Sequence, residues 1–179
     1  MLMMKSFLLA SSLIVLAMAA SAQSIPEKMG VNSALGVAPK TEDFVSLAAQ
    51  SDMLEIETSK LALTKSDSDK TKQFADRMIK DHTETSTELR SLVTVGKIQV
   101  TLPTSLDRAH KEKLDKLAKL NGTAFTKEYD DMQIAAHKDA VSLFERYGKE
   151  GDNAELKAFA NKTLPHLQMH LKMAQELVK

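Results

Sequence analysis

Four of the chain's five histidines fall near the middles of long predicted helices, on faces that the apolar pattern turns inward. The four are His82, His137, His166 and His170, and Glu55 has the equivalent place on a further predicted helix. Imidazole and carboxylate groups at one depth in a helical bundle can converge on a single point, which is how bundles build metal and cofactor sites. The sequence therefore predicts a polar cluster at mid-bundle.

Two chemical interpretations of this cluster stay open. Imidazole suits transition metals such as zinc, copper and iron, so the residues are candidate metal ligands. Alternatively, they form a buried Glu–His hydrogen-bond network without a ligand, because a polar group in an apolar interior is unfavourable unless it is paired or ligated. A haem held by two histidines is a narrower third interpretation.

The common depth of these residues follows from the predicted helix ends. Glu55, His82, His137 and His166 each lie within about two residues of a helix midpoint, and His170 lies about five residues away. At about 1.5 Å of rise per residue, such offsets are within reach of long side chains. A residue near a midpoint keeps its depth whether its helix runs up or down, so the prediction does not depend on the topology.

Known site patterns narrow the chemistry. Carboxylate di-iron bundles need Glu-x-x-His on two helices, and none of the four histidines has a glutamate three residues before it. The chain has no cysteine, which excludes disulfides, thiol catalysis and c-type haem attachment. The sequence shows no nucleophile elbow, phosphate loop or acid–base pair, so a binding role is favoured over an enzyme.

Two further features are weaker candidates for metal chemistry. His166, Met169, His170 and Met173 share one face of the last predicted helix, and thioether beside imidazole suggests copper handling. Methionine also serves as ordinary core filler, so this face has a structural explanation as well. Asp81, at the edge of an inner face, is a candidate acceptor that orients an imidazole.

The elements that position these residues are all predicted to be helical. Apolar residues recur at steps of three and four, and no strand-like alternation is found. The expected helices cover residues 42–64, 69–95, 105–120, 124–147 and 154–179. Thr41 is expected to cap the first of them. The pattern predicts an all-α domain over residues 42–179, a four-helix bundle with one additional short helix.

The N-terminal region has the composition of a targeting segment. Lys5, the apolar run Ser6–Ala20 and small residues up to Ala22 predict a signal peptide over residues 1–22, cleaved after Ala22. Residues 23–41 contain proline and glycine without a sustained period and are predicted to be a flexible linker. The domain is therefore expected to be exported, and periplasmic where the source has an outer membrane.

Charge and composition argue against several partners. The chain carries 24 basic and 24 acidic residues, has no tryptophan and lacks a basic block, so nucleic acid is not an expected partner. The N-terminal apolar run is shorter than the roughly 20 residues that span a membrane, so no stable membrane insertion is expected. A protein partner and the oligomeric state stay open.

Short runs spread from Glu42 to the C-terminus carry a family resemblance. They include Phe74-Ala75-x-x-Met78-Ile79-x-Asp81-His82-Thr83, Leu102-Pro103, Gln133-x-x-x-His137 and Leu164-Pro165 with His170. These runs resemble a bacterial envelope family, the domain of unknown function 4142, which is labelled "predicted outer membrane protein" and grouped with ferritin-like bundles. The resemblance implies a ferritin-like fold and export, and it implicates Glu55, His82, His137 and His170. His166 matches no element of the family.

The resemblance brings no established activity with it, so two functions remain as hypotheses. The first is an exported protein that binds a transition metal through the mid-bundle Glu/His cluster. The second is a metal-free structural or stress-related envelope module that acts through a protein partner.

Overall fold

The computed structural model describes residues 31–96 and 98–179, and this part of the chain contains helices and no strand. The helices are α2 (Val31–Leu35), α3 (Thr41–Lys65), α4 (Asp69–Val95), α5 (Arg108–Ala118), α6 (Gly122–Glu150) and α7 (Ala154–Leu177). The predictions of an all-α fold and of four long helices with a short one before the third are confirmed. The ferritin-like relationship stays a prediction.

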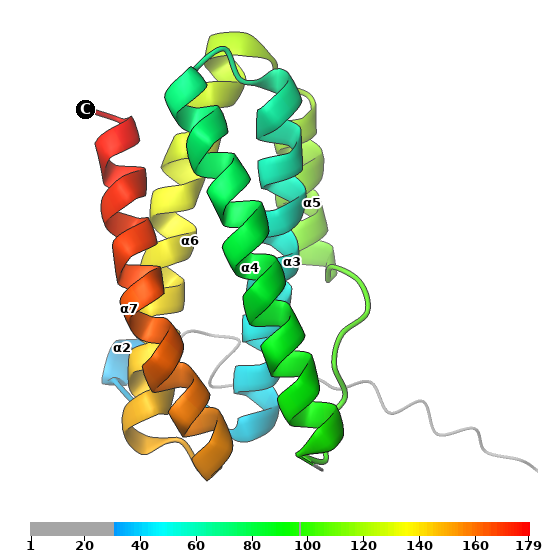
Figure 1. Cartoon of the computed structure of the whole chain (residues 1–179), viewed down its shortest axis with the longest axis vertical. Coiled ribbons are helices and arrows are strands. Elements are labelled where there is room, and N and C mark those ends of the chain that lie inside the picture. Colours follow the sequence, from blue (N-terminus) through cyan, green and yellow to red (C-terminus); the bar gives the residue numbers. More distant parts are fainter. Residues whose placement is uncertain (1–30, 97) are drawn as a thin grey trace, which may run out of the picture.

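The four long helices form one bundle (Figure 1). Helices α3 and α4 make one antiparallel hairpin and α6 and α7 make another, and each hairpin packs along its length. The hairpins meet where α3 contacts α6 and where α4 contacts α7, while α5 covers α3 and α6 from outside. Helices α4 and α6 run in the same direction, because the chain crosses back through α5 between them.

The helix ends follow capping rules at several positions. The Ser68 side chain accepts a hydrogen bond from the Thr71 amide at the start of α4, and the Asn153 side chain accepts one from the Leu156 amide at the start of α7. Gly122 opens α6 with a φ of 57°, a conformation that side chains with a Cβ rarely adopt. Ser68 and Asn153 thus cap the second helix of each hairpin, and Gly122 forms the turn from α5 into α6.

The start of α3 differs from the prediction. Lys40, not Thr41, is the N-cap residue, and its side chain makes no capping hydrogen bond. The Thr41 hydroxyl instead donates to the Asp152 carboxylate and contacts the Tyr147 hydroxyl. Thr41 therefore ties the start of α3 to the α6–α7 turn, and its predicted capping role is wrong because the hydroxyl is used in a tertiary contact.

Two apolar clusters fill the ends of the bundle. The first apolar cluster lies where α3 begins and α6 ends, and it includes Phe44, Leu89, Phe144, Tyr147 and Phe159. The second apolar cluster lies where α3 ends and α6 begins, and it includes Phe74, Met78, Leu117, Phe125 and Tyr129. Between them along the four long helices lies the polar layer, which consists of buried Asp52, Glu55, His82, Gln133, His137 and His170.

The N-terminal predictions are only partly covered by the described residues. The predicted signal peptide and the first part of the predicted linker lie outside them. Within the rest of that linker, Val31–Leu35 forms the short helix α2. No helix in the described part of the chain is long and apolar enough to cross a membrane.

Candidate metal centre

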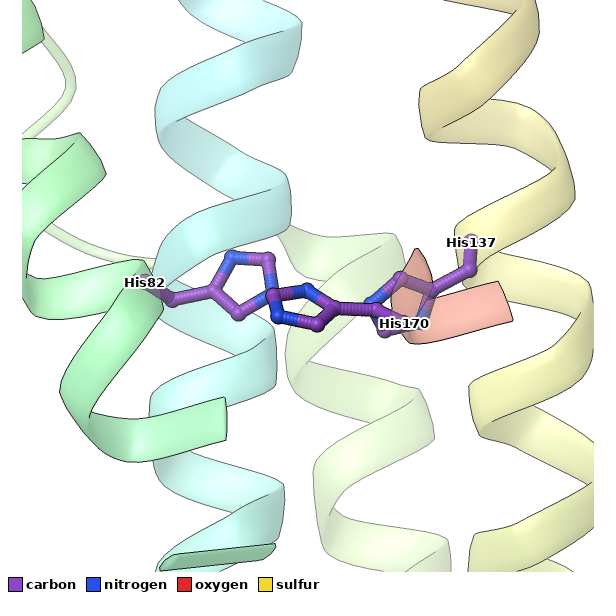
Figure 2. A group of neighbouring side chains, drawn as sticks. All are labelled: His82, His137 and His170. Carbon is purple, nitrogen blue, oxygen red and sulfur yellow. The ribbon is translucent and has the colours of Figure 1, made fainter. Parts of the chain in front are cut away.

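Three imidazole rings from three helices meet inside the bundle. His82 comes from α4, His137 from α6 and His170 from α7, and their rings point toward one another (Figure 2). The ring centroids are 5.5–5.6 Å apart in all three pairs. One nitrogen of each ring lies within 4.8 Å of the corresponding nitrogens of the other two. The three side chains form a nearly equilateral triangle, which we call the histidine triad.

The triad is buried because its members lie on the inner stripes of their helices. On α4 the stripe runs from Met78 through His82 to Leu89, and on α7 it runs from Leu167 through His170. These positions recur at helical spacing, so the faces that bury apolar neighbours also bury the imidazoles. At most 2% of the surface of each triad histidine is exposed to solvent.

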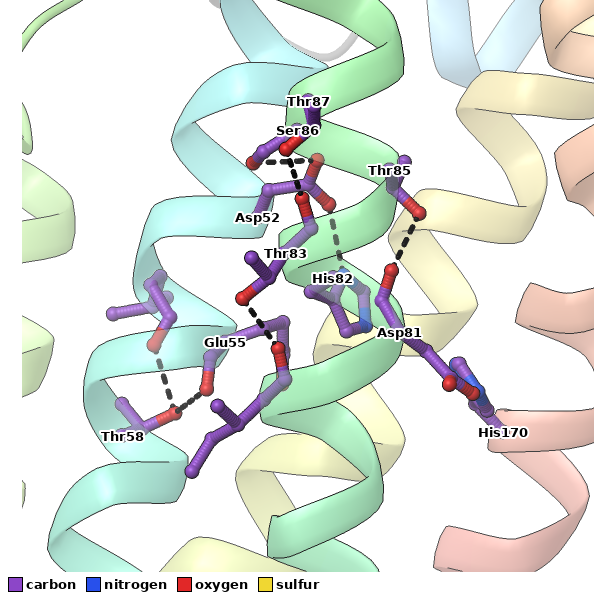
Figure 3. A network of polar contacts seen from close by, with 12 residues as sticks. Asp52, Glu55, Thr58, Asp81, His82, Thr83, Thr85, Ser86, Thr87 and His170 are labelled. Carbon is purple, nitrogen blue, oxygen red and sulfur yellow. Dashed lines mark hydrogen bonds and ion pairs between the residues drawn. The ribbon is translucent and has the colours of Figure 1, made fainter.

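A carboxylate from α3 orients the first ring. The Asp52 carboxylate lies 2.8 Å from His82 Nδ1, and its other oxygen accepts a hydrogen bond from the Ser86 hydroxyl (Figure 3). Burial opposes a charge on His82, but the hydrogen bond and negative charge of Asp52 outweigh it and raise the His82 pKa. Burial also raises the pKa of Asp52 itself. The pair therefore holds a proton on the side of His82 that faces away from the triad.

The second ring is oriented by its own helix. His137 Nδ1 lies 2.9 Å from the backbone carbonyl oxygen of Gln133, one turn earlier. A carbonyl oxygen can only accept, so Nδ1 carries the hydrogen and Nε2 carries the lone pair. Burial lowers the pKa of His137, which keeps this ring neutral.

The third ring is oriented by α4. His170 Nε2 lies 2.8 Å from the Asp81 carboxylate (Figure 3). The same carboxylate also accepts a hydrogen bond from Arg77. Burial lowers the pKa of His170 to about 4, although Asp81 acts in the opposite direction. For Asp81, the hydrogen bond and charge of His170 together with Arg77 outweigh burial and lower the pKa. At neutral pH His170 is therefore a neutral imidazole that donates to a carboxylate.

The three nitrogens that remain all belong to the inside of the triad. His82 Nε2, His137 Nε2 and His170 Nδ1 are buried and have no hydrogen-bond partner among the described residues. In metal centres, a ligating imidazole commonly donates its other N–H to a carboxylate or a backbone carbonyl, and that bond fixes the tautomer. All three rings follow this pattern, so the residues present fit a transition metal held by three nitrogens.

Glu55 and Gln133 extend the polar layer beside the triad. Glu55 Oε2 and both side-chain polar atoms of Gln133 are buried without a partner among the described residues. The negative charge of Glu55 adds to the rise in the His82 pKa, and at His137 it opposes burial, which still lowers that pKa. Glu55 therefore acts on two members of the triad. Its carboxylate is not part of the 4.8 Å group, in which only the three histidines come together.

The structure separates the remaining candidates from one another. Asp81 accepts from His170 and not from its sequence neighbour His82. His166 is exposed and lies outside the triad, although it is nearer to the midpoint of α7 than His170. Depth along the helix is shared by both residues, but only His170 lies on the buried stripe of α7.

Asp52 is the residue in contact with the triad that sequence reasoning missed. It lies one turn before Glu55 on α3 and is itself buried, with 4% of its surface exposed. A carboxylate three residues from another on an inner face was a readable signal, because the pair shares that face. The role of the Gln133 backbone carbonyl could not be read from the sequence, because every residue has a backbone carbonyl.

Comparison with known proteins gives a family and a fold. A family model described as "Domain of unknown function (DUF4142)" matches residues 26–177. No curated protein matches the chain in sequence.

Two similar solved structures are CopM in the Cu(II)-bound form and CopM in the Cu(I)-bound form. The first is 16% identical with a TM-score of 0.65, and the match covers 78% of this chain and 96% of that chain. The second is 18% identical with a TM-score of 0.62, and the match covers 76% and 94%. At these identities the likeness shows a shared fold.

Proposed function

The chain belongs to the DUF4142 family, and for this member we propose that it binds one copper ion through His82, His137 and His170. The observation that carries the proposal is the set of three buried, unpartnered ring nitrogens that face one another while the opposite nitrogens are hydrogen-bonded. A closed hydrogen-bond network would pair these inner nitrogens with one another or with neighbours. The pattern therefore favours a ligand over the metal-free module.

The donor set favours copper. Imidazole nitrogen binds zinc, copper, iron and nickel, and copper(II) forms the strongest complexes among the divalent first-row metals. The polar layer contains no thiolate, because the chain has no cysteine. CopM has been solved with Cu(II) and with Cu(I) bound to the same type of bundle, which makes copper the first metal to test.

Charge balance assigns roles to the neighbouring carboxylates. A divalent cation in a dry interior needs compensating negative charge. Asp52 and Asp81 supply it through His82 and His170, and Glu55 adds a further carboxylate from α3, one turn after Asp52. Glu55 is the candidate for a fourth ligand, since its unpartnered Oε2 faces the interior. We also propose that the protein is exported, with the signal peptide cleaved after Ala22.

The test is a copper titration of the purified protein with elemental analysis and thermal unfolding. Wild type is expected to bind one copper per chain, and an ion at a hundred times its Kd should stabilise the fold by about 2.7 kcal/mol. His137→Ala should lose both the stoichiometric copper and the stabilisation. A copper chelator should return wild type to the stability it has without metal.

His110→Ala is the matched control, because His110 lies on α5, where it bonds Asp107. It should bind copper as wild type does. His170→Asn provides a second triad variant if His137→Ala fails to fold, and circular dichroism reports the helical content of each. Stoichiometric copper in both triad variants, or a wild type that binds neither copper(II) nor copper(I), contradicts the proposal.

A further inference from the structure

A cleft between α4 and α7 leads to the histidine triad. It has a volume of about 190 Å³ and is lined by both helices. His82 and His170 form its inner end, and His166 and Thr85 line it farther along the same two helices. Two of the three proposed ligands are thus reached from one side of the bundle.

Three larger clefts, of about 320, 340 and 420 Å³, are lined by described residues that include none of the three histidines. Two of them lie beside α5, where Lys113 is a shared lining residue. The volume of a cleft therefore does not indicate whether it reaches the triad. Of these four clefts, the smallest, between α4 and α7, is the one lined by triad histidines.

The polar residues of this cleft suit a cation. Asp81, Glu84 and Glu88 supply three carboxylates, against the cationic side chains of Arg77 and Lys162. Glu88 bonds Lys162 at 2.8 Å, which links α4 to α7 through an exposed ion pair. Such a pair contributes only about 0–1 kcal/mol, so it can open at little cost.

His166 is placed to pass an ion inward. It is exposed, and it lies four residues before His170 on α7, so the two imidazoles are neighbours on the helix surface. The Met169 sulfur, also on α7, lies 3.9 Å from Nη2 of Arg77 on α4. Imidazole is a copper ligand, and His166 is the histidine in the lining of the cleft that lies outside the triad.

We propose that copper reaches the triad through the α4–α7 cleft and is bound first by His166, then transferred to His170 one turn away. This inference rests on the proposed function. His166 is a transient ligand in this scheme, so it accelerates loading and release together and leaves the Kd of the final complex unchanged. The sequence made His166 a weaker candidate for a mid-bundle ligand, and the present proposal gives it a separate role at the surface, where its side chain is exposed.

The rate of copper loading tests the route. Aqueous copper(II) is mixed rapidly with the full chain, and the copper–imidazole absorbance is followed. His166→Ala should slow association at least fivefold, with one copper per chain still bound at the end. His110→Ala, which removes a histidine from the α5 side, should load at the wild-type rate. A His166→Ala rate within twofold of wild type would overturn the route.

A blocking variant tests the cleft itself. Thr85→Phe places a ring in the cleft and should slow both association and release at least fivefold. Ala135→Phe places the same ring in a groove beside α5 and should change neither rate. A weaker Kd in His166→Ala at an unchanged association rate would make His166 a ligand of the final complex and overturn the route. Failure of wild type to bind copper would instead overturn the proposed function.

Discussion

The ends of the bundle bury apolar side chains, whereas its middle buries polar ones. In the first apolar cluster, Phe44 stacks on Tyr147 at 3.9 Å and meets the edge of Phe144 at 5.1 Å, so each ring is packed by its neighbours. In the polar layer, His82, His137 and Gln133 keep buried polar atoms without a partner among the described residues. The apolar ends are filled by side chains alone, whereas the middle keeps unpaired nitrogen and oxygen atoms, where we propose that copper binds. Stability and binding should therefore respond to different substitutions.

Phe44→Ala should produce the largest change in stability. Phe44 is fully buried, and loss of a buried phenylalanine costs about 3–5 kcal/mol through lost burial and the cavity left behind. Denaturant unfolding in the presence of chelator measures this loss. Copper affinity should stay within about threefold of wild type, because Phe44 is some 16 Å along α3 from Glu55 at about 1.5 Å per residue.

Leu63→Ala on the same helix is the control, since Leu63 is 38% exposed and should lose less than about 1 kcal/mol. If Phe44→Ala weakened copper binding more than tenfold while the helical content was retained, the separation between the end and the middle would not hold.

Asp52→Asn, in the polar layer, should weaken copper affinity. An amide at this position removes the negative charge beside His82 Nδ1. Its oxygen can still accept from Nδ1–H, but its NH2 group can instead donate to Nδ1, so the tautomer with Nε2 free for a metal is no longer enforced. Loss of such an orienting carboxylate weakens metal affinity by about 10–100-fold, or about 1.4–2.7 kcal/mol. Competition with a chelator of known affinity measures the change. Asp115→Asn, at an exposed carboxylate on α5, should leave the affinity unchanged, and an equal loss in both variants would refute the role of Asp52.

A smaller effect, on the pH dependence of stability, is expected from a buried carboxylate near the end of the bundle. Asp130 is 5% exposed and accepts hydrogen bonds from Thr71, and burial raises its pKa from 3.8 to about 6. The folded state therefore holds a proton that the unfolded state releases. The resulting stability is complete below about pH 4 and is lost as the pH rises through about 6.

Asp130→Asn should remove this pH dependence and stabilise the protein at pH 8 by on the order of 1 kcal/mol. Unfolding at pH 5 and pH 8 with chelator present gives the difference between variant and wild type. Asp131→Asn is the neighbouring exposed control. Because Asp130 lies outside the polar layer, the copper affinity of Asp130→Asn should match wild type, and a pH dependence like that of wild type would contradict the assignment.

The fold was predictable because its signals are local. Apolar spacing identified the four long helices and the short one, and the side chains of Ser68 and Asn153 cap α4 and α7 through bonds to residues three positions on. Thr41 was misjudged because its hydroxyl bonds residues more than a hundred positions away, which no local pattern records. Tertiary contacts of this kind are where the sequence alone stops being informative.

The site was predictable in depth but not in detail. His82, His137 and His170 converge as the helix midpoints indicated, while His166 was included on depth although it lies off the buried stripe of α7. The acceptors Asp52 and the Gln133 carbonyl depend on the rotation of each helix about its axis. A shift of one residue changes the facing direction by about 100° but the depth by only about 1.5 Å, so facing direction is the harder quantity to predict.

The triad also has a consequence for folding kinetics. Its members come from α4, α6 and α7, so the three rings come together only when both hairpins are packed against each other. The two hairpins can form from local contacts before they dock on each other, and at that stage no three-coordinate site exists. An ion that binds only the docked bundle stabilises the native state and not the folding transition state. It should therefore lengthen the lifetime of the folded chain while leaving its folding rate nearly unchanged.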